Sequence, residues 1–165
     1  MIELEIPLYV LPLLESKSIK DLKIKEQVVL LNKIKHLVPP KIKICLETDL
    51  KPEIIKILFE SLDANIFKIN YDIGNSAYEG FSYKDEFNQY FNLIENIHIK
   101  DRLYKGSTVP LGEGDAKILD VLNEIKIRGY KKNLILQAAR INGVNDVKLI
   151  SKYKKFVEDA VGKKH

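Results

Sequence analysis

The sequence predicts an α/β fold in which about five parallel strands alternate with helices. Short runs rich in β-branched residues alternate with longer segments in which apolar residues recur three and four positions apart. This alternation is typical of consecutive βα units, and such units build a parallel sheet.

We expect five strands, each a short and mostly apolar run: Ile2–Leu8, Ile42–Glu47, Ile66–Asp72, Asn96–Lys100 and Asn133–Gln137. The segments between them carry helix signals. Pro39 and Pro40 end a helical face that begins near Leu30. Pro52 suits the first position of the next helix. The later signals are a capping box at Ser82–Asp85, a cap at Asp115 with a closing Gly129, and a last helix from about Asn145.

Composition narrows the class of protein. A chain of 165 residues that is 45% hydrophobic can bury the core of one domain, which we expect to span residues 1–165. The single cysteine, Cys45, excludes a disulfide scaffold and fits a reducing, cytoplasmic setting. A net charge of +4 is too small to indicate a nucleic-acid binder, and no apolar run approaches the roughly 20 residues that cross a bilayer.

Polar side chains recur at the carboxyl ends of the expected strands. Because side chains alternate along a strand, Glu47, Asp72, His98 and Gln137 fall on the same inner face of successive strands. Four oxygen and nitrogen donors of this kind match a divalent transition-metal site. Each residue alone also has a plainer interpretation: a solvated carboxylate, a hydrogen-bonded core histidine or a polar plug.

A glycine-rich loop follows the fourth expected strand, with Gly106, Gly112 and Gly114 close together. Loops in this position hold the chemistry of parallel α/β folds. The glycines fit either a phosphate cradle at a helix N-terminus or a plain tight turn. Asp115 would repel an anion there, so the sequence favours the turn.

At these residues the sequence resembles the xylose isomerase-like TIM-barrel superfamily of sugar and sugar-phosphate isomerases and epimerases. The segments that carry the resemblance span nearly the whole chain and are Ile44–Thr48, Asn70–Asn75, Asn96–Arg102, Val109–Gly114 and Leu134–Arg140. The resemblance implies a partial barrel of about five parallel strands, corresponding to the fourth to eighth strands of a (β/α)₈ barrel. The first three βα units would then be absent, because a full barrel takes about 250 residues.

The resemblance also implies roles for individual residues. Glu47, Asp72, His98 and Gln137 fall at the family's metal-ligand positions, and Asn75 falls where many members place a substrate-facing histidine. The expected activity is a metal-dependent isomerisation or epimerisation of a small sugar or sugar phosphate through an enediolate-like intermediate. The cofactor would be Mn²⁺, Mg²⁺, Co²⁺ or Zn²⁺.

In that reaction Glu47 would act as general base. Lys100 would either neutralise oxyanion charge or simply pair with a carboxylate. Arg102 and Arg140 could contact a substrate phosphate, although an exposed surface position is the plainer interpretation of Arg140.

Two departures from the family pattern limit the expectation. Gln137 stands where sugar epimerases have glutamate, and an amide can coordinate a cation but cannot act as a base. A five-stranded piece would also leave open sheet edges, so we expect self-association or a partner chain that covers them. The alternative function is therefore a non-catalytic remnant or one subunit of a split barrel.

The superfamily also contains apurinic endonucleases with a three-zinc cluster. These enzymes need further His and Asp ligands, and the stretch Gly106–Thr108 offers neither. Asn75 also replaces a histidine ligand. The sequence therefore disfavours DNA repair, and we expect neither a nucleic-acid nor a membrane partner.

Overall fold

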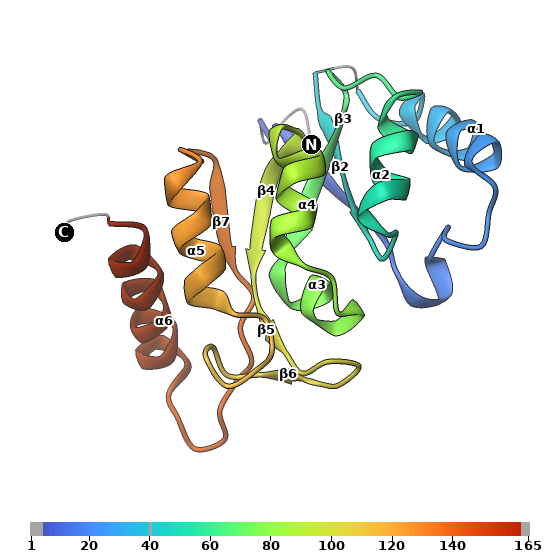
Figure 1. The fold of residues 1–165 in the computed structure, drawn as a ribbon. Helices are drawn as coiled ribbons and strands as arrows, with labels where there is room; N and C mark the ends of the chain where they lie inside the picture. Colours follow the sequence, from blue (N-terminus) through green and yellow to red (C-terminus); the bar gives the residue numbers. More distant parts are fainter. Residues whose placement is uncertain (1–4, 40, 163–165) are drawn as a thin grey trace. The chain divides into compact units, whose positions relative to one another are not determined.

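The computed structural model describes residues 5–39 and 41–162 (Figure 1). It contains a five-stranded parallel sheet whose strands lie in the order β1 (Leu8–Leu13), β2 (Lys43–Thr48), β3 (Phe67–Asp72), β4 (Ile94–Ile99) and β7 (Asn133–Leu136). Helices connect these strands, so the predicted α/β class with about five parallel strands is confirmed.

The chain groups into two compact units, and the boundary between them falls inside strands β3 and β4. The first unit holds the residues up to Tyr71 together with Lys84–Asn96, and the second holds Asp72–Tyr83 together with the residues from Ile97 onward. Our expectation of one domain over residues 1–165 stays a prediction.

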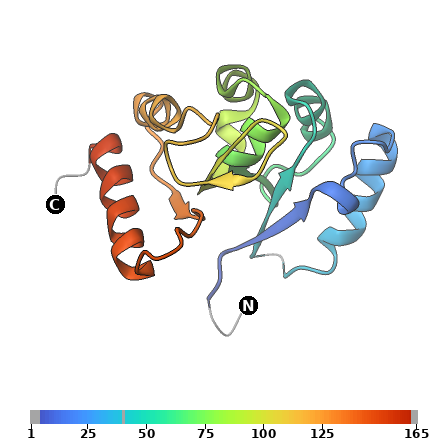
Figure 2. The same cartoon turned by 90° about the horizontal axis from the view of Figure 1, so that it is seen from below.

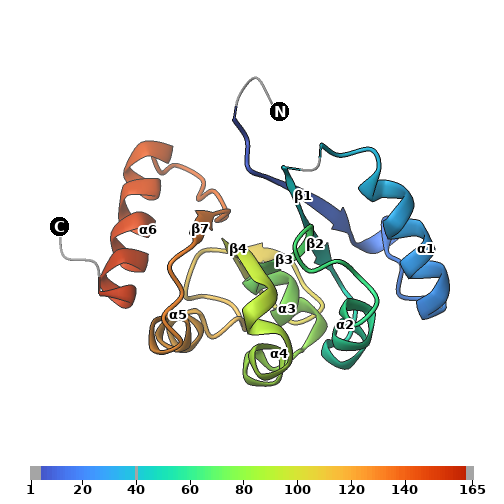
Figure 3. The same ribbon diagram turned by 90° about the horizontal axis from the view of Figure 1, so that it is seen from above.

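In the first unit, β1 and β2 pair in parallel from Leu8 opposite Lys43 to Leu13 opposite Thr48. Helices α1 (Ile24–Lys35) and α2 (Pro52–Phe59) contact each other and lie on the same side of this pair (Figure 3). Pro52 is the first residue of α2, as the sequence predicts. The fixed backbone angle of proline suits this position, where its missing N–H costs no helical hydrogen bond. Two 3₁₀ turns, η1 (Glu15–Lys17) and η2 (Phe91–Leu93), complete this unit with α4 (Tyr83–Tyr90).

The predicted first strand, Ile2–Leu8, is wrong in position. Residues 2–4 lie outside the described residues, and β1 begins only at Leu8. The strand runs through Pro12, which pairs in register with Glu47. A terminal strand tolerates proline because one side of its backbone has no neighbouring strand to bond, and for this reason proline did not end the strand here.

The first unit buries a carboxylate between two tyrosines. Glu86 of α4 is 3% exposed and accepts hydrogen bonds from the hydroxyls of Tyr71 (2.9 Å) and Tyr90 (2.7 Å). The Tyr71 ring packs edge-on against Phe87. Burial, and next the nearby Glu86 carboxylate, raises the pKa of the Tyr90 hydroxyl well above its usual value.

In the second unit, α3 (Ile73–Glu79) follows β3 without a loop, and an antiparallel hairpin of β5 (Asp101–Arg102) and β6 (Thr108–Val109) follows β4. Helix α3 contacts β5, and α5 (Ile118–Ile127) contacts α6 (Asp146–Val161), as Figure 2 shows for α5 and α6. The side chain of Asn145 accepts hydrogen bonds from the N–H groups of Val147 and Lys148, which confirms the predicted start of the last helix.

The predicted cap at Asp115 is wrong. Helix α5 begins at Ile118, and the residue before it is Lys117 in the left-handed conformation (φ 47°). The Asp115 carboxylate instead accepts a hydrogen bond from the N–H of Tyr104 at 2.7 Å. A short acidic side chain can serve any nearby N–H group, and here a partner eleven residues away has displaced the helical one.

Among the described residues, no helix is long and apolar enough to cross a membrane.

Candidate metal centre

A row of hydrogen-bonded polar side chains crosses three neighbouring strands in the first unit. Glu47, near the end of β2, is 8% exposed, and its carboxylate accepts a hydrogen bond from the amide of Asn70 on β3 at 2.8 Å. The Asn70 carbonyl oxygen in turn accepts one from the amide of Asn96 on β4 at 2.6 Å. All three residues are buried, and these bonds fix the Glu47 carboxylate on this face of the sheet.

The strands continue from this row toward their carboxyl ends. Asp72 follows Asn70 by two residues, and His98 follows Asn96 by two residues. Because alternate residues of a strand share a face, Asp72 and His98 are the next side chains on the face that carries Asn70 and Asn96. The hydrogen bonds that join Glu47, Asn70 and Asn96 therefore agree with the inner face that the sequence predicts for these strands.

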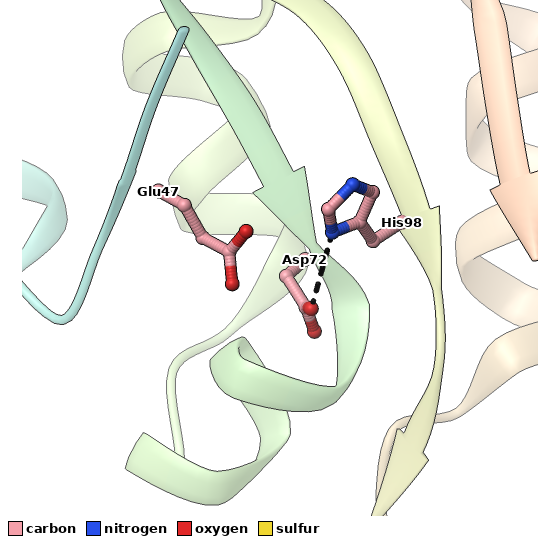
Figure 4. A group of neighbouring side chains, drawn as sticks. All are labelled: Glu47, Asp72 and His98. Atoms are coloured by element: carbon pink, nitrogen blue, oxygen red, sulfur yellow. Dashed lines mark ion pairs between the residues drawn. The ribbon is translucent and has the colours of Figure 1, made fainter. Parts of the chain in front are cut away.

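In the second unit, Asp72 lies at the centre of a charged cluster. Its side chain is 1% exposed, and its Oδ1 accepts a hydrogen bond from the N–H of Asn75 at 2.8 Å, which caps α3. The other oxygen, Oδ2, is 3.6 Å from Nδ1 of His98, the ion pair that the dashed line marks in Figure 4. Nζ of Lys100 is 2.8 Å from the same Oδ2.

The Asp72 Oδ2 atom is suited to bind a cation. Within the described residues it is buried and makes no hydrogen bond of regular geometry, although the Lys100 ammonium lies close enough for an ion pair. Two ligand atoms that each lie about 2.0–2.2 Å from a metal can be 3.6 Å apart, so Oδ2 and the His98 nitrogen can share one ion. The donor set therefore fits a divalent metal.

Glu47, Asp72 and His98 form the candidate metal-ligand group of the described residues, and each offers one ligand atom (Figure 4). Glu47 and Asp72 are buried, and His98 is mostly buried, with a side chain 13% exposed. A set of carboxylate and imidazole ligands suits Zn²⁺, Co²⁺ and Mn²⁺.

The fourth predicted ligand, Gln137, lies in a different environment. It directly follows β7, a terminal strand of the sheet, and its side chain is exposed. Its backbone N–H donates to the carbonyl of Ile99 at 3.0 Å, so its main chain is held beside β4. The role of Gln137 as a ligand stays a prediction.

The structure holds Arg102 firmly in the second unit. Its Nη1 donates to the Asn75 side chain at 3.1 Å, its Nη2 donates to the Gly106 carbonyl at 3.1 Å, and its guanidinium stacks over the Tyr78 ring at 4.1 Å. Asn75 is 9% exposed. Arg102 and Asn75 therefore interact with each other, and their proposed contacts with a substrate stay predictions.

Arg140 has no such support. Its side chain is 86% exposed and lies 3.6 Å from the Asp146 carboxylate. A pair this open to solvent contributes little to stability. A contact between Arg140 and a substrate also stays a prediction.

The glycine loop is a braced turn. The buried Asp101 carboxylate accepts hydrogen bonds from the N–H groups of Gly112 (2.8 Å), Gly114 (3.1 Å) and Ala116 (3.2 Å). A Cβ atom at Gly114 would lie 2.2 Å from Asp101 Oδ1 and 2.7 Å from the Arg102 carbonyl oxygen. These amides already bind a protein carboxylate, and this favours the turn over a phosphate cradle.

Two sets of polar contacts in the structure are not predicted by the sequence. Alternation places Asn70 on the inner face, yet nothing in the pattern indicates that it bonds Glu47 and Asn96. A second cluster follows the ends of β1 and β2, where the Ser18 hydroxyl donates to the buried Asp49 carboxylate and Lys20 pairs with it at 3.2 Å. These residues are 31 positions apart, and no motif links them.

Comparison with known proteins identifies the fold. No protein-family model matches the sequence, and no curated protein matches it closely. Among solved structures, the chain is similar to a xylose isomerase domain protein from Planctomyces limnophilus, with a TM-score of 0.75 and 18% identity, over 95% of this chain and 59% of that one.

Two further structures agree with this result. A D-tagatose 3-epimerase-like protein gives a TM-score of 0.70 at 21% identity, over 98% of this chain and 66% of that one. The IOLI protein, solved with a bound zinc atom, gives 0.74 at 19% identity, over 94% of this chain and 63% of that one.

The chain thus has the fold of part of a xylose isomerase-like TIM barrel, which confirms the predicted resemblance and the partial-barrel architecture. It spans 59–66% of the length of these three proteins. At these identities the likeness establishes the fold alone.

Proposed function

We propose that this chain forms the metal-binding part of a sugar or sugar-phosphate isomerase or epimerase. The observation that carries the proposal is the buried Asp72–His98 pair, which follows directly in β3 and β4 from the row that fixes Glu47. Under this proposal, Glu47, Asp72 and His98 bind a divalent cation with Gln137. The cation would supply Lewis-acid stabilisation of negative charge on adjacent substrate oxygens.

The proposed proton transfer belongs to Glu47. Its carboxylate would remove the proton from the carbon next to the substrate carbonyl, and the Asn70 amide, 2.8 Å away, would hold it in position. Lys100 would offset negative charge that develops on the substrate. Asn75, Arg102 and Arg140 would contact the remaining substrate groups, with arginine suited to a phosphate.

The proposal includes a completing partner. The chain spans only part of the length of the barrels that it matches, and β1 and β7 are terminal strands of its sheet. Unpaired strand edges favour association. Self-association or a partner chain would complete the substrate pocket.

A non-catalytic role is the second candidate. Gln137 cannot act as the second base of a two-carboxylate epimerisation, and this observation favours a remnant or split-barrel subunit that keeps the fold and the metal site. The two candidates share metal binding and differ in turnover.

One experiment tests both candidates. Purified protein is analysed for bound metal and then assayed with Mn²⁺, Co²⁺, Mg²⁺ and Zn²⁺ on a panel of ketoses and their phosphates, beside a Glu47→Gln variant. Turnover that the variant loses by at least 100-fold supports the enzyme. Bound metal without turnover supports the remnant, and failure to bind any metal contradicts both candidates.

A further inference from the structure

We propose that Lys100 is a counter-ion built into the metal site. Its ammonium and a divalent cation compete for the same oxygen of Asp72, so metal binding releases Lys100 to an anionic group of the ligand. This inference rests on the proposed function, because it assigns the regulation of that same site. It concerns the second unit alone.

The ion pair is buried and close. Lys100 Nζ is 2.8 Å from Asp72 Oδ2, and the two side chains are 13% and 1% exposed. A positive charge with so little access to water is stabilised by an opposite charge beside it. Asp72 therefore serves Lys100 in the way that it would serve a metal.

The path of the Lys100 side chain depends on a glycine. Gly74 lies in the first turn of α3, and a Cβ atom there would lie 2.9 Å from Cγ and 3.0 Å from Cε of Lys100. Any larger residue would displace the lysine stem, because real Cβ atoms do not approach carbon so closely. The glycine at this position thus allows the ammonium to reach Asp72.

Geometry brings the two cations into competition for one oxygen. The other oxygen of Asp72 already accepts the N–H bond from Asn75, so Oδ2 is the oxygen that faces both His98 and Lys100. A metal at about 2.2 Å from Oδ2 would lie no more than about 5 Å from the ammonium in its present place. Two positive charges at this distance inside a protein repel each other, so metal binding favours movement of the Lys100 ammonium away from Asp72.

The displaced ammonium then needs a new partner. A substrate phosphate, a carboxylate or the negative oxygen that forms during isomerisation all share the required chemistry, which is an anionic oxygen beside the metal. An anion that pairs with Lys100 lowers the cost of displacing it, so anion and metal should strengthen each other's binding by the same factor. The site would bind metal tightly only when an anionic ligand accompanies it.

The test compares the Mn²⁺ affinity of the full chain with that of Lys100→Met, measured by competition with a chelating indicator. Lys105→Met is the matched control, because it removes the same charge from an exposed residue that pairs with Glu79. We expect Lys100→Met to bind Mn²⁺ at least tenfold more tightly and the control to stay within twofold of the wild type. Inorganic phosphate should tighten Mn²⁺ binding by the wild type and by the control, but not by Lys100→Met.

Each outcome decides the inference. Unchanged or weaker Mn²⁺ binding by a folded Lys100→Met overturns it, while binding by the wild type keeps the metal site intact. If Lys100→Met does not fold, Lys100→Gln, which retains a donor for Asp72, replaces it with the same expectation. If neither the wild type nor a folded variant binds Mn²⁺, both the metal site and the counter-ion role fall.

Discussion

The central strands and the terminal strand β7 end in different environments. On β2 and β3, Glu47 and Asp72 are buried and fixed by named partners, whereas Gln137 after β7 is exposed. Ile135 of β7 is likewise 45% exposed. Alternation assigns a face equally well in both regions, but only strands with neighbours on both sides bury that face. The comparison teaches that a metal-ligand prediction is best supported where a strand is flanked.

Removal of the Asp72 carboxylate should have the largest effect. Asp72→Ala leaves the Lys100 ammonium buried without its partner and removes the cap of α3, so we expect the free energy of unfolding to fall by about 3–5 kcal/mol. Urea denaturation measures this change. Asp72→Asn, which keeps the capping oxygen, should lose less. A loss below about 1 kcal/mol for the alanine variant would show that the central strand ends are as tolerant as β7.

The loop that contains Gly114 should tolerate substitution less well than the loop that follows β7. Gly114→Ala would place a methyl group against Asp101 and the Arg102 carbonyl, and we expect a destabilisation of about 2–3 kcal/mol. Gly143, in the loop after β7, has a positive φ of 78° but nothing within 4 Å of a Cβ atom. Gly143→Ala should therefore cost only about 1 kcal/mol, from backbone strain. Thermal denaturation ranks the two variants, and equal losses would contradict the braced turn.

A pair of buried tyrosines sharpens the comparison further. The Tyr90 hydroxyl donates to Glu86, whereas the Tyr153 hydroxyl on α6 is buried without a hydrogen-bond partner among the described residues. We expect Tyr90→Phe to lower the free energy of unfolding by about 1 kcal/mol and Tyr153→Phe to leave it unchanged or raise it. Denaturant unfolding at neutral pH measures both variants.

Tyr90 also predicts a pH dependence. Its pKa is raised in the folded protein above the usual 10.0, so the folded state holds this proton more tightly than the unfolded state. Its contribution is fully present below pH 10.0 and is lost as the pH rises from there toward the folded pKa. Tyr90→Phe should flatten this alkaline decline of stability. An unchanged decline would assign the effect to other groups.

Gln137→Ala should have the smallest effect on stability, within about 0.5 kcal/mol, because its side chain is exposed. Metal affinity is the informative measurement for this variant. A weaker affinity for Mn²⁺ would assign Gln137 to the ligand set, and an unchanged affinity would confine the ligands to the central strands.

The sequence predicted four of the five strands to within a few residues, since periodicity records which side chains must be buried. It missed α3, because Ile73–Glu79 is short and mixes glycine, small and aromatic residues without a clear apolar face. It also missed the hairpin, whose strands are two residues each. Asp115 was misassigned because capping chemistry alone does not specify which N–H group a carboxylate serves.

For the candidate site, the sequence predicted Glu47, Asp72 and His98 as ligands but not the contacts that position Glu47 and Asp72. Asn70, Asn96 and Gly74 contact residues that are remote from them in the sequence. These contacts depend on how the strands and helices pack, and a local sequence pattern does not predict that packing.

The hydrogen bonds that Asp101 accepts from the glycine loop have an evolutionary consequence. One carboxylate anchors the far side of the loop through three backbone amides, and backbone groups are the same for every non-proline residue. Side-chain substitutions between Leu103 and Leu111 would therefore leave these three hydrogen bonds in place. The side chains of this stretch are free to vary during evolution without a change in β4, the strand that bears His98.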